Sequence, residues 1–273
     1  MSEILIIGEI NLDIFILLDD SKNHTKNYST KIGGTAYNIA KSLKNLKIKP
    51  IIFSYIGEDF IGKGIYNELS KYFNLNLIQK VNSTNIILYF IKEDKFDVVG
   101  LRKQDLIFKV NENFLKLYND IKIVHISPYI FMNNENFKFF NEIKRENKIF
   151  LTNLSIPILD NQRFLKILNK FDYIFMNLEE AKKLTKKENL EEIKKFLKKN
   201  FINSIITLMD GVYFLNKEEE IFLETEKINK KINIGAGDYL IGGFISGLYR
   251  NLRIEDCLKF GIESVKNYLN FIK

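Results

Sequence analysis

The sequence predicts an α/β protein: a mostly parallel central sheet covered by helices on both faces, in three layers. Short apolar runs alternate along the chain with longer stretches of helical periodicity. Most of these runs lack the strict alternation of a half-exposed strand, which is typical of strands buried on both faces. Strands that alternate with helices form βαβ units, and such units build a parallel sheet.

The expected strands are apolar runs at 4–8, 51–57, 121–126, 148–153, 172–177 and 204–208. Helices are expected between them, for example at 35–46, 61–73, 134–146 and 189–200. Two segments break this rhythm. Residues 12–32 have no crossover helix, and residues 84–101 have the pattern of two strands around a polar turn. We expect both to be extended antiparallel structure in a small sheet, within one domain over residues 1–273.

The charge balance does not by itself indicate a nucleic-acid partner. The 273 residues carry a net charge of +7, but the lysines interleave with acids, as in residues 187–199. There Leu190, Ile193 and Leu197 recur at helical spacing, which predicts a solvated helix face over an apolar stripe. We therefore expect no nucleic-acid partner, although the positive charge would attract an anionic small substrate.

Cysteine usage and the first residues indicate a cytoplasmic protein. A single cysteine, Cys257, excludes an internal disulfide and is expected to be a buried small hydrophobe. The apolar N-terminal stretch carries Glu3, Glu9 and Asp13 and has no basic leader. It therefore resembles neither a signal peptide nor a membrane span, and no membrane partner is expected.

The glycine-rich stretch 57–64, "GEDFIGKG", almost fits a phosphate-binding loop. Gly64 stands where that loop needs a hydroxyl for magnesium. Glu58 and Asp59 would place negative charge where a phosphate must lie. We therefore reject this stretch as a phosphate loop.

The stretch 235–240, "GAGDYL", opens an apolar helix near the end of the chain. Too few residues follow it to build a dinucleotide-binding domain. Gly235, Ala236 and Gly237 can instead expose their N–H groups at a helix start, where the helix dipole favours anions. Asp238 would then be a carboxylate beside an anion hole; alternatively, it only caps its own helix.

Four motifs occur in a fixed order at the ends of expected strands. Residues 31–43, "KIGGTAYNIAKSL", place paired glycines before a helix that carries Asn38, and residues 55–62 are "YIGEDFIG". Residues 176–181, "MNLEEA", follow the fifth strand, and "GAGD" comes last. Together they resemble the ribokinase family, the PfkB-type carbohydrate and nucleoside kinases, over nearly the whole chain.

The resemblance implies a ribokinase-like sandwich with a small β lid over the substrate, for which segments 12–32 and 84–101 are the candidates. Family lids often pair between two subunits, so a homodimer through the lid is possible. The implied activity is transfer of the γ-phosphoryl group of ATP to a hydroxyl of a sugar or nucleoside. The alternative is a binding or regulatory protein that keeps the fold without turnover.

By the same resemblance, Asp238 is the base that takes the proton of the acceptor hydroxyl. The backbone N–H groups of residues 235–237 hold the transferring phosphoryl group. At a helix N-terminus we expect this carboxylate to stay ionised, and a loose transition state asks little of its base. Asn177 and Glu180 match the Asn-x-x-Glu that organises Mg²⁺ and phosphates, often through water. Alternatively, Asn177 caps the following helix and Glu180 is an exposed acid.

The resemblance assigns two further groups of residues. Substrate hydroxyls would be bound by Asn11, Asp13, Gly33, Gly34 and Asn38, besides Asp238. The nucleotide would be bound by Asn177, Thr207, Gly211, Asn233, Gly235 and Gly237. The segment 153–157, "NLSIP", is similar to adenosine kinases and hints at a nucleoside, but the choice between sugar and nucleoside stays open.

The sequence departs from the family pattern near both nucleotide motifs. Ile232 and Asn233 replace an Asp-Thr pair whose Asp helps to hold a monovalent cation in relatives. The chain also ends shortly after its last helix, where relatives line that cation site, so activation by a monovalent cation is not expected. Met209 takes a glycine position in the loop after Thr207, which makes that loop bulkier. These departures motivate the alternative of a binding protein.

Overall fold

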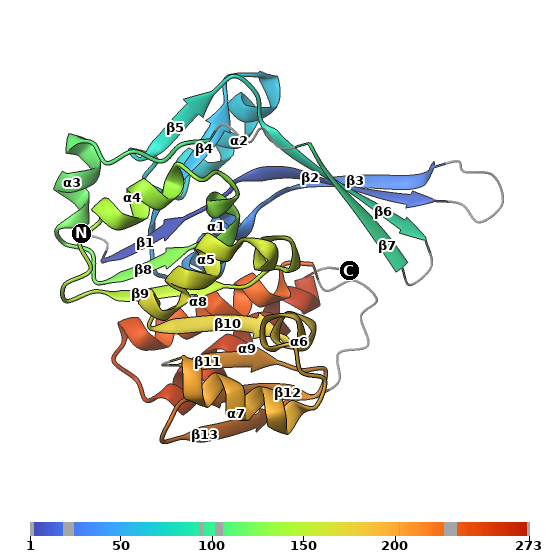
Figure 1. The fold of residues 1–273 in the computed structure, drawn as a ribbon. Coiled ribbons are helices and arrows are strands. Elements are labelled where there is room, and N and C mark those ends of the chain that lie inside the picture. Colours follow the sequence, from blue (N-terminus) through green and yellow to red (C-terminus); the bar gives the residue numbers. More distant parts are fainter. Residues whose placement is uncertain are drawn as a thin grey trace.

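The central sheet of the protein, seen in a computed structural model, lies between two layers of helices (Figure 1). The structure describes residues 3–18, 25–92, 95–101, 106–201, 203–226 and 234–271. Within these ranges, nine strands form the sheet in the order β13-β12-β11-β10-β9-β8-β1-β4-β5. Their bounds are β1 Ile4–Ile7, β4 Ile51–Gly57, β5 Ile78–Val81, β8 Ile123–Ile126, β9 Ile149–Asn153, β10 Tyr173–Asn177, β11 Ser204–Thr207, β12 Gly211–Leu215 and β13 Glu220–Glu224.

The strand pairs from β11 to β5 are parallel, whereas β11–β12 and β12–β13 are antiparallel. This confirms the predicted mostly parallel sheet, and all six expected strands occur with small shifts at their ends. The sequence analysis did not identify β5, β12 and β13. These strands lie at or next to the edges of the sheet, and the outermost one, β13, alternates between exposed and partly buried residues.

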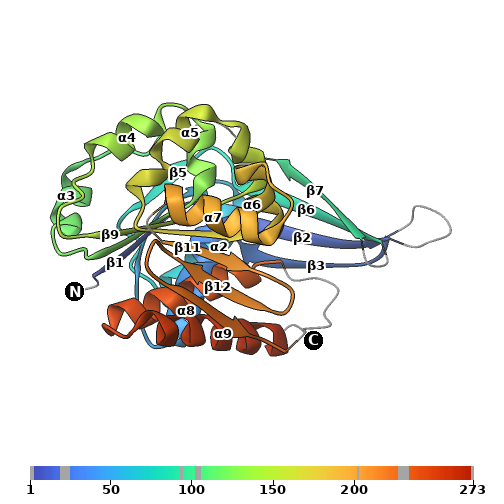
Figure 2. The same cartoon turned by 60° about the horizontal axis from the view of Figure 1, so that its bottom comes forward.

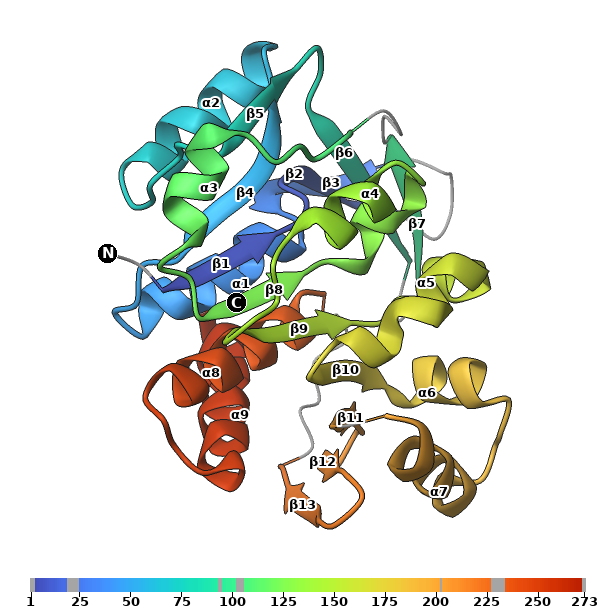
Figure 3. The same ribbon diagram turned by 60° about the vertical axis from the view of Figure 1, so that its left-hand side comes forward.

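Each face of the sheet carries its own hydrophobic core. Along β1, Leu5 and Ile7 belong to one core, whereas Ile4 and Ile6 belong to the other, because successive side chains point to opposite faces. The face that carries Ile4 is covered by helices α1 Thr35–Asn45, α2 Phe60–Ser70, α8 Ala236–Tyr249 and α9 Ile254–Phe271. The opposite face is covered by helices α3 Glu112–Tyr118, α4 Asn136–Glu142, α5 Gln162–Ile167, α6 Leu178–Thr185 and α7 Leu190–Asn200. Figure 3 shows α8 and α9 on one side of the strands and α5, α6 and α7 on the opposite side.

The helix expected over 134–146 is shorter than predicted. A 3₁₀ turn at Pro128–Met132 precedes α4, which covers only Asn136–Glu142. The chain leaves the helix at Ile143 in an extended conformation, and Asn147 then adopts a left-handed turn with φ 58°. Asparagine tolerates this conformation better than most residues, so the polar stretch before β9 forms a turn rather than further helix.

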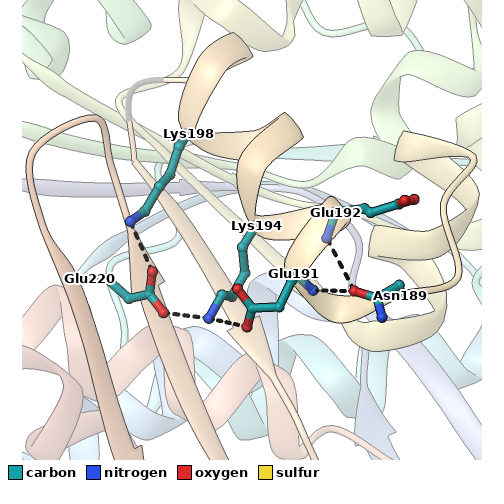
Figure 4. A network of polar contacts seen from close by, with 6 residues as sticks. All are labelled: Asn189, Glu191, Glu192, Lys194, Lys198 and Glu220. Carbon is teal, nitrogen blue, oxygen red and sulfur yellow. Dashed lines mark hydrogen bonds and ion pairs between the residues drawn. The ribbon is translucent and has the colours of Figure 1, made fainter.

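The surface of α7 confirms the predicted solvated face over an apolar stripe. Ile193 and Leu197 are fully buried and Lys195 and Lys199 are exposed, while ion pairs lie at the border of the apolar stripe, around the largely buried Lys194. The Lys194 ammonium contacts Glu191 at 2.7 Å and also pairs with Glu220 of β13. Figure 4 draws the polar contacts of this region, which join Asn189, Glu191, Glu192, Lys194, Lys198 and Glu220. Part of the lysine content of the chain therefore serves local ion pairing.

A second sheet projects sideways from the central one (Figures 1 and 2). Its strands are β2 Asn11–Leu18, β3 Thr25–Gly33, β6 Asn85–Lys92 and β7 Lys95–Leu101, in the order β3-β2-β6-β7. These are the two segments that broke the βα rhythm, so the prediction of a small extended sheet is confirmed. Only the pairing of β2 with β6 is parallel. Because β2 follows β1 closely, this sheet begins at the carboxyl end of the central strands.

The stretch 57–64 has a structural role that agrees with its rejection as a phosphate loop. Asp59 caps α2 by accepting the Gly62 N–H at 2.7 Å, and it also accepts the N–H and hydroxyl of Thr84 at 2.6 and 2.7 Å. Its carboxylate is therefore used in joining α2 to the start of β6. The expectation for Cys257 is confirmed, since this residue is buried and packs where a Cβ on Gly247 would lie. No helix in the described ranges is long and apolar enough to span a bilayer.

Candidate active site

The N-terminus of α8 presents small residues to a cavity. Gly235 is the N-cap residue and has φ 89°, a left-handed conformation that glycine adopts without strain. A Cβ added to Gly237 would meet no atom within 4 Å, so only open space lies in front of this glycine. The rest of the helix from Tyr239 to Gly247 is buried. The N–H groups at its start, which have no acceptor within the helix, thus lie at the positive end of the dipole of a buried helix, which favours the binding of an anion.

A cleft of about 720 Å³ lies in front of this helix start. Its size is in the range of sites for small molecules, on the order of 300–1,000 Å³. Seven of the site residues predicted from the sequence line it: Asn177, Glu180, Thr207, Gly211, Ala236, Gly237 and Asp238. They come from the ends of β10 and β11, the starts of α6 and β12, and α8. The fold therefore brings three motifs that are distant in the sequence to one cleft.

Asn177 and Glu180 form a capping box at the start of α6. The Asn177 side chain accepts the Glu180 N–H at 2.8 Å, and Glu180 Oε2 accepts the Asn177 N–H at 2.8 Å. Burial raises the pKa of the Glu180 carboxyl to about 7, against the opposing effect of this hydrogen bond. The capping role considered for Asn177 is therefore realised in the structure, whereas Glu180 is partly buried rather than an exposed acid; both residues also line the cleft.

The oxygen donors of this pair suit Mg²⁺ with few protein ligands. Mg²⁺ typically takes one or two carboxylates, several waters and substrate phosphates. Oε2 of Glu180 serves the cap, which leaves Oε1 for a water or an ion. Among the described residues, no group of three or more His, Cys, Asp or Glu side chains is close enough to hold a metal alone. The pair therefore fits a hydrated ion rather than a closed protein cage.

The carboxylate of Asp238 lies where α8 meets α1. Its Oδ2 accepts from Asn38 Nδ2 at 2.9 Å, and the N-cap position of α8 belongs to Gly235. Burial raises the pKa of this carboxyl from 3.8 to about 7; the Asn38 bond opposes the shift, Glu9 and Asp13 add to it, and Lys31 lowers it. The expectation that Asp238 stays fully ionised is wrong. The sequence shows the helix terminus, but it does not show that the carboxyl group is buried and that two further acids lie near it.

The expected substrate residues cluster beside Asp238, but none of Asn11, Asp13, Gly33, Gly34 and Asn38 lines the two cavities described here. Asn11 and Asp13 are 4% and 2% exposed. A Cβ on Gly33 would lie 1.9 Å from Asp13 Oδ2, so the glycine leaves room for this carboxylate. Gly34 has φ 94° and packs against the Glu9 carbonyl. These largely buried residues pack where the small sheet and α1 meet, next to Asp238.

A second cavity of about 200 Å³ lies between the two sheets. Its lining includes Glu9, Ser54, Tyr55, Asn85 and Tyr129. The Ser127 hydroxyl donates to Glu9 at 2.8 Å, and the Ser155 hydroxyl donates to Tyr129 at 2.6 Å. The hydroxyls of Ser54 and Tyr55 are buried without a hydrogen-bond partner in the described part of the chain. Such groups are suited to bind the polar groups of a ligand.

The residues of this smaller cavity were not predicted from the sequence. Glu9 entered the sequence-based expectations only as a charge that argues against a membrane span. A usable signal was present, because Glu9 follows closely after β1 and ligands in parallel α/β sheets bind beyond the carboxyl ends of strands. Tyr129 carries the same signal, since it follows closely after β8, whereas Asn85 reaches the cavity from the small sheet and carries none.

Of the three positions at which the sequence departs from the family pattern, only Met209 lies among the described residues. Asn233, expected to contact the nucleotide, and Ile232 lie outside the described residues. Met209 is 88% exposed at the edge of the larger cleft. The bulkier residue therefore does not fill the cleft.

Comparisons with known proteins agree on one family and one fold. A family model described as "pfkB family carbohydrate kinase" matches residues 1–264. An ATP-dependent 6-phosphofructokinase of Thermoanaerobacterium thermosaccharolyticum is 25% identical, over 95% of this chain and 85% of that protein. A cytidine kinase of Thermococcus kodakarensis is 23% identical, over 98% and 96% of the two chains.

Solved structures confirm the predicted fold class. The adenosine kinase from Sinorhizobium meliloti superposes with a TM-score of 0.83 at 18% identity, covering 97% of this chain and 93% of that one. The ribokinase from Thermotoga maritima gives a TM-score of 0.76 at 18% identity, covering 99% and 100%. At such low identity the similarity establishes the ribokinase-like architecture alone.

Proposed function

The chain belongs to the PfkB family of carbohydrate kinases, and from that premise we propose that it transfers the γ-phosphoryl group of ATP to a hydroxyl of a sugar or nucleoside. Family membership makes it a phosphotransferase with an alcohol group as acceptor. One observation carries the more specific proposal. Residues of three distant motifs line one cleft, and Asp238 lies there in the first turn of α8, where it accepts a hydrogen bond from Asn38.

Asp238 acts as the general base in this proposal. As the acceptor O–H bond breaks, its proton passes to the Asp238 carboxylate, and the acceptor oxygen forms a bond to the terminal phosphorus. The bond from that phosphorus to the bridging oxygen breaks, and the nucleoside diphosphate leaves with the electron pair. A pKa of about 7 suits this role, because a base works best when its pKa lies near the operating pH.

The start of α8 stabilises the charge that develops in transfer. Phosphoryl transfer depends mainly on positioning and on donors aimed at the equatorial oxygens. The N–H groups of Gly235, Ala236 and Gly237 supply such donors, and the open space before Gly237 leaves room for the phosphoryl group. Donors fixed at a helix start need no reorganisation during the reaction.

The larger cleft is the proposed ATP site. Thr207 and Gly211 line it beside Asn177 and Glu180, and we propose that Asn233 joins them. Mg²⁺, when bound, would neutralise phosphate charge, and Glu180 with Asn177 would orient its waters. A monovalent cation is not part of the proposal. Equal turnover in sodium and potassium salts would agree, and a large stimulation by potassium would contradict this point.

The acceptor is proposed to bind on the side of Asp238 that faces the small sheet. Asn11, Asp13, Gly33, Gly34 and Asn38 lie there, and the smaller cavity adds Glu9 and its neighbouring hydroxyls. We propose that the small sheet serves as the lid of this site. Buried polar groups of this kind select strongly, because a ligand that leaves them unpaired binds poorly.

We also propose that the lid carries a homodimer contact. The face of the small sheet opposite to Asp13 is largely apolar: Leu12, Ile14, Ile16, Ile86, Leu88, Phe90, Val99 and Leu101 share it by register, and the polar Thr30 and Asp97 also lie on it. Of these, Val99 and Leu101 are 45% and 56% exposed. A second copy would cover this face. Light scattering should give a dimer mass for the wild type and a monomer mass for Val99→Lys; a monomeric wild type would contradict the proposal.

The experiment that tests the kinase proposal is ATP turnover with Mg²⁺ over a panel of acceptors. The panel contains ribose, ketohexoses, fructose phosphates, 2-keto-3-deoxygluconate, adenosine, cytidine and inosine, with Asp238→Asn as control. Turnover of one acceptor that is lost in the variant would support the proposal. Binding of ATP and an acceptor without turnover of any of them would favour the alternative of a binding protein.

A further inference from the structure

A hydrogen-bonded chain runs from the small sheet to the residue before the helix start. Lys31 lies on β3, opposite Asp13 in the register of β2 and β3. Its ammonium donates to the Tyr268 hydroxyl at 3.1 Å, and that hydroxyl donates to the Ile234 carbonyl at 2.6 Å. Ile234 immediately precedes Gly235, whose carbonyl accepts the first helical N–H of α8. Three segments distant in the sequence therefore meet at one phenol oxygen.

Aromatic contacts hold both ends of this chain in place. The Tyr268 ring stacks on Tyr239 with centroids 4.0 Å apart and planes 20° from parallel. Tyr239 follows Asp238 in α8, so α9 is tied to the helix that carries the proposed base. On the other side, the Lys31 ammonium lies 4.7 Å from the centroid of the Phe15 ring. The ammonium thus has a fixed place rather than a solvated one.

The charges around this chain are mostly negative. Glu9 and Asp13 act on Asp238 as like charges, and Lys31 is the cation that opposes them. Lys31 itself has a lowered pKa, first because of burial and also because of Lys41 on α1, while Asp13 and Asp238 act against this. The ammonium of Lys31 is therefore close enough to both carboxylates, Asp13 and Asp238, for their charges to favour its protonated form.

We propose that Lys31 and Tyr268 are positioning residues for phosphoryl transfer. Tyr268 fixes the Ile234 carbonyl and with it the left-handed turn at Gly235 that aims the N–H groups of α8. Lys31 holds Tyr268 from the small sheet and offsets the charge of Asp13 and Asp238, so that Asp238 can ionise. This inference rests on the proposed kinase function for its kinetic consequences, but its electrostatic part is testable without turnover.

The kinetic test uses two variants that separate the two roles. Tyr268→Phe keeps the ring stack and removes the hydroxyl; we expect kcat to fall about tenfold at every pH, as the loss of one well-placed hydrogen bond implies, with little change in KM for the acceptor. Lys31→Met keeps the apolar stem and removes the charge; we expect the acidic limb of the kcat profile to move up by about half a pH unit. Lys31→Arg should restore the wild-type limb.

Lys41→Met is the matched control, because it removes one positive charge from the same neighbourhood without a contact to Tyr268. It should leave both kcat and its pH profile unchanged. An acidic limb of the pH profile of kcat that moves equally in Lys41→Met and Lys31→Met would overturn the role of Lys31. A kcat for Tyr268→Phe equal to that of the wild type would overturn the role of Tyr268.

A ¹³C NMR titration of the Asp238 carboxyl in the ligand-free protein tests the same inference without catalysis. The apparent pKa of this carboxyl should rise in Lys31→Met and stay at the wild-type value in Lys41→Met. An unchanged value in Lys31→Met would overturn the electrostatic inference even if the protein is an active kinase. A raised value in a protein that phosphorylates no acceptor would refute the proposed function and leave this electrostatic inference standing.

Discussion

The two sides of Asp238 are built by different kinds of contact. On the side of the larger cleft, Asn177 and Glu180 bond to each other across three positions of the sequence. On the side of the small sheet, Asn38 reaches Asp238 across 200 positions, and Lys31 reaches Tyr268 across 237. The first side is organised by a local helix cap, whereas the second depends on the complete fold.

This difference decides what a substitution should do. A residue in a local cap stabilises its own helix whether or not a ligand is present, so its loss should appear first in stability. A polar residue held between distant elements in a buried site is costly to maintain and is more often retained for chemistry. Substitutions on the two sides should therefore separate effects on activity from effects on the fold.

The largest effect is expected for Asp238→Asn, on the side built by distant contacts. The amide is nearly isosteric with the carboxylate but cannot accept the proton, and a general base contributes about 10²–10⁴-fold to turnover. Steady-state kinetics should show a loss of kcat in this range, with little change in KM for ATP. A variant that retains more than a tenth of the wild-type kcat would show that Asp238 is not the base.

The second effect tests the helix start itself. Gly237→Ala places a methyl group in open space, so the fold should gain about 0.5–1 kcal/mol from the better helix former. The same methyl group would crowd the proposed phosphoryl site, and kcat should fall on the order of 10²-fold, comparable with the loss of an oxyanion donor. Thermal unfolding and turnover of one protein preparation measure both quantities.

Gly64→Ala serves as the control, since a Cβ at Gly64 in α2 also meets open space and lies away from both cavities. It should gain similar stability and keep full activity. If both variants remain fully active, the space before Gly237 is not used in the reaction. If both lose activity, the effect of Gly237→Ala is not specific to the site.

The same contrast explains how much the sequence could predict. The central sheet could be predicted from apolar runs typical of strands buried on both faces. The cleft could be predicted from the spacing of Asn177 and Glu180 and from the run 235–238. Each of these signals is contained in one segment of the sequence. Lys31, Tyr268 and Glu9 were missed as site residues, since their importance comes from partners on other elements. For the same reason the raised pKa of Asp238 could not be anticipated, because it depends on burial and on acids from β2 and from the connection between β1 and β2.

The pH dependence of stability gives a smaller, directional effect. The Asp238 carboxyl has a pKa of about 7 when folded and an ordinary value near 3.8 when unfolded. Between these values the folded state holds the proton more tightly, so stability falls as pH rises from about 4 to 7. Asp238→Asn removes this cost and should be more stable than the wild type at pH 8, by a few kcal/mol at most.

Below the unfolded pKa the carboxyl is protonated in both states, and the difference between the two proteins should vanish. Denaturant melts at several pH values give both curves. Parallel curves would mean that the folded and unfolded pKa values of Asp238 are equal and that the neighbouring acids do not act on it.

The smallest effect is expected on the side of the local cap. Asn177→Ala removes the side chain that accepts the Glu180 N–H and should lower the free energy of unfolding by about 1 kcal/mol. Asn189→Ala is its match, because Asn189 is the N-cap of α7, where its side chain also accepts backbone N–H groups, and it does not line the cleft. If Asn177 also orients the waters of Mg²⁺, only its variant should need several-fold more Mg²⁺ for half-maximal turnover. An equal loss of stability with an equal Mg²⁺ requirement in the two variants would reduce Asn177 to a helix cap, and the contrast between the two sides of Asp238 would then be complete: local contacts would serve the fold, and distant ones the chemistry.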